Sequence, residues 1–241
     1  MPHERLAAER DFFDAQYRIE QPPLNGFYAA SAVRREYEQK VLANCAGLRV
    51  LEYGCGTGSN AFALAARGAE VIGVDISNTA IELAREQAAA SGNLQFQLGD
   101  AEALDFPAGT FDLVCGTSIL HHLDIERALT ELKRVLKPGG RAIFYEPLAY
   151  NPLINLYRRM TPHLHTRDEH PLNKRDLDAM SERFGRVTFR FADLLALAAI
   201  PLLQLPGGRV FLRGLERADQ IVMRVPGLRW WGAVVLIEIC A

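Results

Sequence analysis

The residues with the clearest chemical meaning form a glycine-rich turn. Gly54, Gly56 and Gly58 occupy alternate positions after the strand-like run Val50–Tyr53. Because glycine has no Cβ, a ligand can lie directly against the main chain at such a turn. Glu52 lies just before the turn, where its carboxylate would attract a cation and repel a phosphate. The turn therefore favours a ligand with an ammonium or sulfonium group over a dinucleotide pyrophosphate.

A second acidic residue supports a nucleoside ligand. Asp75 ends the apolar run 71–74, about 20 residues after the turn, which is the spacing at which an acid reaches a ribose hydroxyl pair in nucleoside-binding α/β units. A glycine-rich turn alone can be a bare strand-to-helix connection without a ligand. Asp75 and two later turns, Gly99–Ala101 and Gly116–Ser118, also follow predicted strands. Together with the glycine-rich turn they favour a ligand-binding site.

Side chains able to transfer protons lie further along the chain. His121 and His122 follow the fourth predicted strand, Glu146 ends the fifth, and Glu169 and His170 are neighbours in a polar loop. Each could act as a general base on a bound substrate, and Glu146 could instead contact the substrate. The simpler alternatives are a histidine that only fixes its loop and a hydrogen-bond network within the polar loop.

Alternating strands and helices must position these residues. Such alternation predicts a parallel sheet covered by helices on both faces, whose ligands bind at the carboxyl ends of the strands. The motifs described above fall at such ends. Strands are predicted at 50–53, 71–75, 94–98, 111–115 and 141–146, with helices at 59–67, 78–91 and 125–136 between them.

Six motifs appear in a fixed order between Leu48 and Pro147: Glu-x-Gly-Cys-Gly-Thr-Gly, Val-Asp-Ile-Ser, Gly-Asp-Ala-Glu, Phe-Asp-Leu-Val, His-His-Leu and Leu-Lys-Pro-Gly-Gly. Their order resembles the class I S-adenosylmethionine-dependent methyltransferases, in particular the small-molecule branch with ubiquinone/menaquinone-type and natural-product enzymes. The resemblance implies an α/β, Rossmann-like fold: a seven-stranded, mostly parallel sheet with helices on both faces, N-terminal helices and a helical insert between the last two strands.

The resemblance also implies the cofactor, S-adenosylmethionine, with S-adenosylhomocysteine as its product. Glu52 and the three glycines of the turn would surround its methionine part, and Asp75 would hold the ribose hydroxyls. The other implied contacts are Ile76 against the adenine, Asp100 at the adenine amino group, Ala101 through its main chain and Thr117 near the methionyl end.

We interpret residues 1–241 as a single domain: an N-terminal helical cap (1–46), a cofactor-binding core (47–147) and a substrate-side region (148–241). In the family the last two strands, here 186–191 and 230–240, pair antiparallel. The apolar insert between them, 192–228, is predicted as two helices separated at Pro206–Gly208. We favour a lid over an apolar substrate, with core packing and a surface for a partner subunit or a membrane as alternatives.

The composition of the chain limits the kinds of partner that the protein is expected to bind. A net charge of −2 with 23% charged residues and no long basic run argues against nucleic acid, and four scattered cysteines argue against a metal or redox site. The polar N-terminus lacks a secretory signal, and the apolar segment of the insert is too short to span a bilayer. We expect a cytoplasmic protein without metal or transmembrane segment. Peripheral membrane contact and a homodimer remain open.

The expected function is methyl transfer to a small, apolar or amphipathic metabolite, on oxygen, nitrogen or carbon, in secondary metabolism. A nicotinamide-dependent oxidoreductase is one alternative, but the Gly-x-Gly-x-Gly spacing and Glu52 argue against it. A cofactor-binding partner subunit without catalysis is the other.

Overall fold

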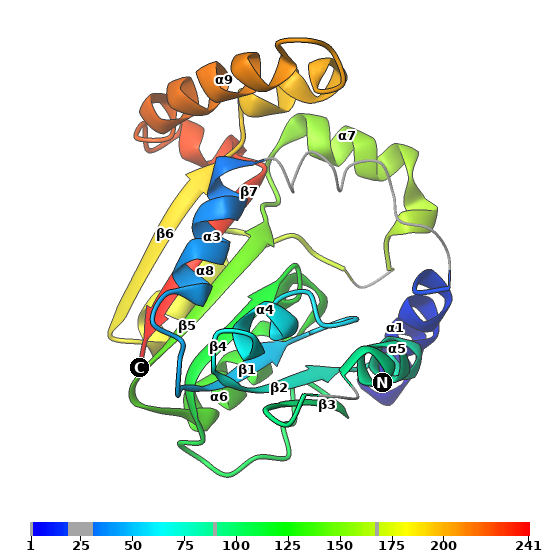
Figure 1. The fold of residues 1–241 in the computed structure, drawn as a ribbon. Coiled ribbons are helices and arrows are strands. Elements are labelled where there is room, and N and C mark those ends of the chain that lie inside the picture. The colour runs from blue at the N-terminus through cyan, green and yellow to red at the C-terminus, as the bar shows by residue number, and fades with distance from the viewer. Residues whose placement is uncertain (1, 19–30, 89–90, 167–168) are drawn as a thin grey trace.

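A seven-stranded sheet organises the molecule in the order β3-β2-β1-β4-β5-β7-β6 (Figure 1). The computed structural model describes residues 2–18, 31–88, 91–166 and 169–241. All strands are parallel except β7, which is antiparallel to both β5 and β6. The fold prediction and the antiparallel pairing of the last two strands are confirmed. The strands are β1 Arg49–Tyr53, β2 Glu70–Asp75, β3 Leu94–Leu98, β4 Phe111–Thr117, β5 Leu136–Pro147, β6 Arg186–Ala192 and β7 Val234–Cys240.

The central strands are apolar on both faces because helices cover both sides of the sheet. Successive residues of β1 point to opposite faces, so Val50 joins one core and Leu51 the other. Helices α3, α4 and α5 contribute to the first core, and α6 and α8 to the second. The helices are α1 Pro2–Gln16, α3 Ala32–Leu42, α4 Ala61–Ala65, α5 Asn78–Ala88, α6 Ile125–Val135, α7 Pro152–Met160, α8 Lys174–Arg183 and α9 Gly208–Val222.

Two asparagines begin helices on the substrate side. Asn173 caps α8: its side chain accepts from Arg175 N at 2.8 Å, while Asp176 accepts from Asn173 N at 2.8 Å. Asn151 caps α7 in the same way, and its Nδ2 also donates to Trp231 O at 2.6 Å. That bond connects α7 to the short 3₁₀ helix η4 Leu228–Trp231 before β7.

The insert differs from its prediction. The expected helix 192–205 is a 3₁₀ helix, η3 Ala196–Leu202, which contains Pro201. A proline inside a helix lacks a donor and disrupts regular α geometry, which explains the tighter turn. The last strand begins at Val234 instead of Trp230, because η4 occupies the intervening residues. No helix in the described ranges is long and apolar enough to cross a bilayer.

Buried acids hold the two parts of the insert together and attach the insert to the rest of the protein. Ser31 Oγ donates to Asp193 Oδ2 at 2.7 Å, and Asp219 accepts from Leu195 N at 2.8 Å and from Ala196 N at 3.0 Å. Burial, together with the nearby charges of Asp219 and Glu216, raises the pKa of Asp193 to about 7. Asp193 also has a left-handed backbone with φ 63°, a conformation that asparagine tolerates well.

We expect Asp193→Asn to stabilise the protein at alkaline pH. The raised pKa means that the native state holds a proton which the unfolded state has already lost, so stability falls as pH rises from about 4 to about 7. The variant should remove this dependence on pH and raise the free energy of unfolding by about 2–4 kcal/mol at pH 8. Denaturant unfolding at pH 5 and pH 8 measures the effect. Asp178→Asn, at an exposed residue of α8, is the control, and an equal gain in both variants would contradict the assignment.

Candidate active site

Two adjoining cavities lie at the carboxyl ends of the central strands, near the reversal of strand order between β1 and β4. The first has a volume of about 100 Å³ and the second about 580 Å³, and the second is within the range of small-molecule sites. Gly54, Thr117 and His122 border both cavities. A ligand in the first cavity can therefore meet a ligand in the second at these residues.

The glycine-rich turn combines ligand access with packing. Gly54 and Gly56 have φ values of 66° and 52°, and a Cβ on either would overlap the side chain of Ile119 or Tyr17 respectively. Gly54 borders both cavities and Gly56 borders the second. A Cβ on Gly58 would instead meet the rings of Phe62 and Phe96, and Gly58 borders neither cavity. Two of the three glycines thus leave main chain open to a ligand.

The position of Glu52 before the turn suggested that its carboxylate faces the ligand, but in the structure the carboxylate points toward α4. Its buried carboxylate accepts from Ser59 Oγ at 3.0 Å, from Asn60 N and Nδ2 at 2.7 Å, and from Ala61 N at 2.9 Å. It therefore caps the first turn of α4 and borders neither cavity. Burial raises the pKa of this carboxyl above its usual value. A direct contact between Glu52 and a cofactor stays a prediction.

Asp75 lies at the end of β2 on the wall of the first cavity. Its Oδ2 accepts from Gly56 N at 2.7 Å and its Oδ1 from Ser77 N at 2.9 Å, so it connects the glycine-rich turn to the next strand. Burial raises the pKa of Asp75. The other expected nucleoside contacts that border this cavity are Ile76, Asp100, Ala101 and Thr117, whose roles stay predictions.

Glu146 was expected to act as a general base or to contact the substrate, and its position in the structure corrects that expectation. Its carboxylate is fully buried under the 3₁₀ helix η1 Leu120–His122 and borders neither cavity. Oε1 accepts from Ile119 N at 2.9 Å and from Leu120 N at 3.0 Å, and Oε2 lies 2.8 Å from His121 Nδ1. Glu146 therefore holds η1 and orients His121.

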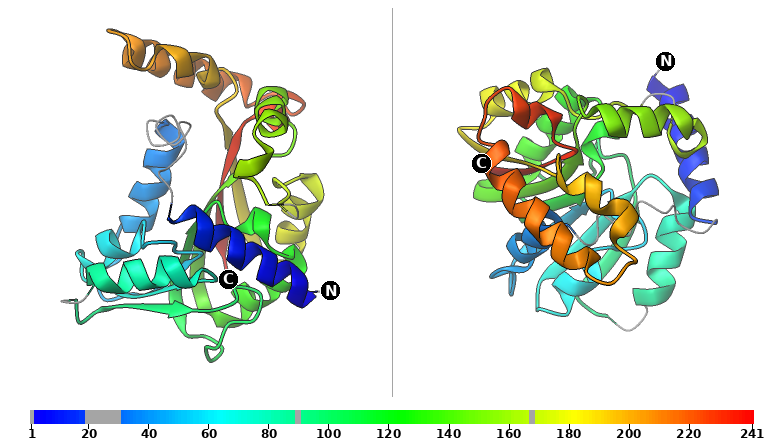
Figure 2. Two further views of the ribbon diagram at one scale, coloured as in Figure 1. Left: turned by 90° about the vertical axis from the view of Figure 1, so that its right-hand side faces the viewer. Right: turned by 90° about the horizontal axis from the view of Figure 1, so that it is seen from above.

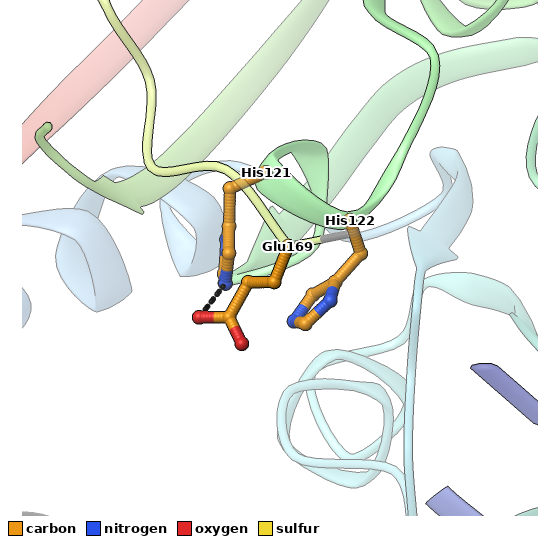
Figure 3. Close-up of side chains that lie close together, drawn as sticks. All are labelled: His121, His122 and Glu169. Carbon is orange, nitrogen blue, oxygen red and sulfur yellow. Dashed lines mark ion pairs between the residues drawn. The ribbon is translucent and has the colours of Figure 1, made fainter. Parts of the chain in front are cut away.

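Glu169 joins the two histidines at the second cavity, as Figure 3 shows. Its Oε1 lies 3.6 Å from His121 Nε2 and 2.5 Å from Arg158 Nη1. His170, its neighbour, is a second correction: its side chain is exposed and borders neither cavity, and its backbone N–H donates to His121 O at 2.9 Å. Of the two expected residues of the polar loop, only Glu169 thus borders the cavity, where Nδ1 of His165 from the same loop lies 3.3 Å from Glu169 Oε2.

The two adjacent histidines differ in charge. Burial would lower the pKa of His121, but the hydrogen bonds and charges of Glu146 and Glu169 outweigh it and raise the pKa to about 9. Burial and the positive charge of His121 lower the pKa of His122 below its usual 6.5. At neutral pH the site therefore holds a protonated and a neutral imidazole side by side.

Helix α1 supplies site residues that sequence reasoning missed. Phe13 and Tyr17 border both cavities, the Phe13 ring packs edge-on at 5.1 Å against His122, and Glu9 Oε2 lies 3.5 Å from His122 Nδ1. Figure 2 (left) shows α1 crossing in front of the rest of the molecule. The N-terminal helical cap was expected, but no residue pattern indicated which of its side chains would border the cavities.

His121, His122 and Glu169 also satisfy a spacing test for a metal ion, with one ligand atom each within 4.8 Å of the others. The existing charges compete with a metal. Arg158 already pairs with Glu169, and His121 holds a proton that a metal would have to displace. We interpret the group as an ion-pair network, and the expected absence of a metal stays a prediction.

The residues present fit a nucleoside that carries a sulfonium group. Gly54 and Gly56 bring main chain to the cavity walls, and the Asp75 carboxylate lies on the wall of the first cavity. The second cavity continues from Thr117 to the histidines. A parallel sheet closed by an antiparallel β7, with this turn after β1, defines the fold of class I methyltransferases.

Comparison with known proteins gives the family. Residues 51–144 match the family model described as a methyltransferase domain. A demethylmenaquinone methyltransferase of Clavibacter sepedonicus is 37% identical over 121 residues, which cover 50% of this chain and 49% of that protein. The chain spans about half the length of the curated relatives it matches. The resemblance to the class I S-adenosylmethionine-dependent methyltransferases is thus confirmed over the matched core.

Solved structures agree on the fold. The YcgJ protein of Bacillus subtilis superimposes with a TM-score of 0.58 at 22% identity, covering 86% of this chain and 98% of that one. A geranyl diphosphate C-methyltransferase from Streptomyces coelicolor gives a TM-score of 0.61 at 17% identity, covering 87% and 78%. These likenesses extend over the substrate-side region, beyond the matched core.

Proposed function

We propose that the protein transfers the methyl group of S-adenosylmethionine to a small, amphipathic acceptor with an ionisable hydroxyl group. The observation that carries the proposal is the meeting of two cavities at Gly54, Thr117 and His122. When bound, the cofactor supplies an electrophilic methyl carbon on its sulfonium. Asp75 would hold the ribose and the main chain at Gly54 and Gly56 the methionyl part.

The histidine pair divides the proton chemistry. Neutral His122 removes the hydroxyl proton of the acceptor with Nε2, while Glu9 faces its Nδ1. Protonated His121, whose two ring nitrogens face Glu146 and Glu169, acts on the negative charge that develops on the acceptor oxygen through its positive charge and not through a hydrogen bond. Glu146 and Glu169 keep His121 protonated and fixed in place. Two groups whose pKa values are driven apart by their surroundings thus take different roles.

The second cavity supports an amphipathic acceptor. Its wall includes apolar and aromatic side chains, such as Phe12, Ile154 and Val234, together with charged Arg34 and Arg158. The names of the relatives, a demethylmenaquinone methyltransferase and a geranyl diphosphate C-methyltransferase, support small acceptors of this kind. A cytoplasmic location and a homodimer stay predictions.

Radiolabelled transfer tests the proposal. The protein is incubated with S-adenosylmethionine labelled in its methyl group and with a panel of phenols, quinols, amines, sugars and peptides. Label is expected in hydroxylated aromatic acceptors with an apolar substituent, and the labelled position identifies the atom. Thermal shifts with S-adenosylhomocysteine and NADH test the oxidoreductase alternative. Tight cofactor binding without transfer to any acceptor would instead favour a partner subunit.

We expect a bell-shaped pH profile of kcat/KM. Activity needs neutral His122 and is lost as pH falls below the usual histidine value of 6.5, because the pKa of His122 is lowered. Activity also needs protonated His121 and is lost as pH rises through about 9. Glu146→Gln removes a carboxylate that raises the pKa of His121, so its alkaline limb should move to lower pH. An unmoved alkaline limb in this variant would contradict the role of His121.

A further inference from the structure

Exposed apolar side chains gather in one part of the described structure. Of the twelve large apolar side chains that are exposed in the described ranges, eleven lie between positions 150 and 231, and the exception is Leu98. They lie on or beside α7, α9 and η4, which Figures 1 and 2 show at the same end of the molecule. We call this surface the α7–α9 face. Its exposed apolar members are Tyr150, Leu153, Leu156, Met160, Leu205, Val210, Phe211, Ile221, Val225, Leu228 and Trp231.

Helix α9 has a buried side and an exposed apolar side. Leu212, Glu216 and Asp219 face the protein, at helical spacing. Val210 and Ile221 lie on the opposite side of the helix and are 63% and 69% exposed. Apolar residues at such exposure cost free energy in water, so an outward apolar side of this kind indicates a contact surface.

The charges of α9 are segregated by sign. Its two acidic residues are buried: Glu216 accepts from Ala32 N at 2.6 Å and Asp219 caps η3. Its basic residues, Arg209, Arg213 and Arg217, are all exposed. Their spacing places the three arginines along one border of the apolar side. The exposed side of α9 therefore combines apolar residues with positive charge only.

Helix α7 connects this surface to the second cavity. Leu153, Leu156 and Met160 are 60%, 55% and 73% exposed. Ile154 and Tyr157, on the other side of the same helix, border the second cavity. The bond from Asn151 to Trp231 O fixes the start of α7 to η4, so these parts of the face are tied together.

We propose that the α7–α9 face docks on an anionic membrane surface. A helix with apolar residues on one side and arginines along the border lies in the interfacial plane of a bilayer, where anionic headgroups attract the arginines. The proposal goes beyond methyl transfer, because it assigns a partner to a surface outside the active site. It also places the outer side of α7 in lipid while the inner side borders the second cavity, which gives an amphipathic acceptor a short route from the bilayer.

A second copy of the chain fits the face less well. In a two-fold symmetric contact the same patch meets itself, so the arginine row of one copy would approach that of the other. Like charges at close range oppose such a contact. Anionic lipid headgroups instead complement the arginines along the whole row.

Vesicle flotation without cofactor or acceptor tests the proposal. We expect binding to phosphatidylcholine vesicles that contain phosphatidylglycerol as a third of their lipid, and much weaker binding to pure phosphatidylcholine. Ile221→Asp should weaken binding about tenfold or more, since it places an acid against anionic headgroups. Arg213→Gln and Arg217→Gln should each weaken it about fivefold. The matched controls, Leu98→Asp and Arg67→Gln, change exposed residues outside the face and should bind as the unaltered protein does.

Several results would overturn the proposal. They are no flotation with anionic vesicles, equal binding to neutral and anionic vesicles, and equal losses in Ile221→Asp and Leu98→Asp. A dimer in sedimentation equilibrium that Ile221→Asp dissociates, without vesicle binding, would assign the face to a second copy. Circular dichroism of each variant separates lost docking from lost folding. Because flotation uses no cofactor, its outcome is independent of the methyl-transfer assay.

Discussion

Replacing His122 by alanine is expected to lower kcat about 10²–10³-fold, the usual contribution of a positioned general base. His122 is the histidine that borders both cavities, and its lowered pKa keeps it neutral at pH 7. Steady-state kinetics with a labelled methyl donor measures the loss. His163→Ala is the matched control, because His163 lies in the nearby 3₁₀ helix η2 Pro162–Leu164 with an exposed side chain.

Chemical rescue distinguishes a base from a residue that only packs. The ring of His122 contacts Phe13, so the alanine variant also leaves a gap beside α1. Imidazole added to the His122→Ala protein should restore part of kcat if the missing function is proton removal. No rescue by imidazole, with cofactor affinity unchanged, would show that His122 does not act as the base.

Replacing Asp75 by alanine is expected to weaken binding of S-adenosylhomocysteine about 10–100-fold. A hydrogen bond to a carboxylate contributes about 1.5–3 kcal/mol, so the loss of one ribose bond already corresponds to about 10–100-fold. The change also removes the acceptor for Gly56 N, so the glycine-rich turn loses its tie to β2. Isothermal titration calorimetry measures the affinity.

Asp112→Ala provides the control for this titration. Asp112 lies at the amino end of β4, away from the cavities, and its carboxylate pairs with Lys137 at 2.8 Å. Its variant should bind the cofactor product with unchanged affinity. Unchanged affinity in Asp75→Ala as well would show that the ribose assignment is wrong.

The core of the fold was predictable because its signals are local. Apolar runs define β1 to β4 within two residues, and β3, Leu94–Leu98, matches its prediction at both ends. The cap that Asn173 places on α8 is a signal of the same kind, because it depends only on nearby residues. Strand ends also located Asp75 and Asp100 at one cavity, since the carboxyl ends of parallel strands share an edge. Ile76 borders the same cavity and was expected there from the family resemblance alone.

The remaining site depended on contacts that no local pattern encodes. Glu52 and Glu146 stand at strand ends, as expected for ligand contacts, yet each carboxylate accepts backbone N–H groups from the segment packed over it. Glu9 reaches His122 from more than a hundred positions away. Such pairings arise from how α1 and η1 pack on the sheet, and this tertiary arrangement decides which acid faces a cavity and which is enclosed.

The surplus of acidic groups around the histidines affects how a catalytic cycle would end. Glu9, Glu146 and Glu169 face two cations, Arg158 and protonated His121, so acidic groups remain in excess around the histidines. Under the proposed function the donor arrives positively charged and leaves as an uncharged thioether. The surrounding negative potential attracts the first form and is indifferent to the second. After transfer the product S-adenosylhomocysteine is no longer attracted by the acidic groups. This loss of attraction favours its exchange for a new molecule of S-adenosylmethionine.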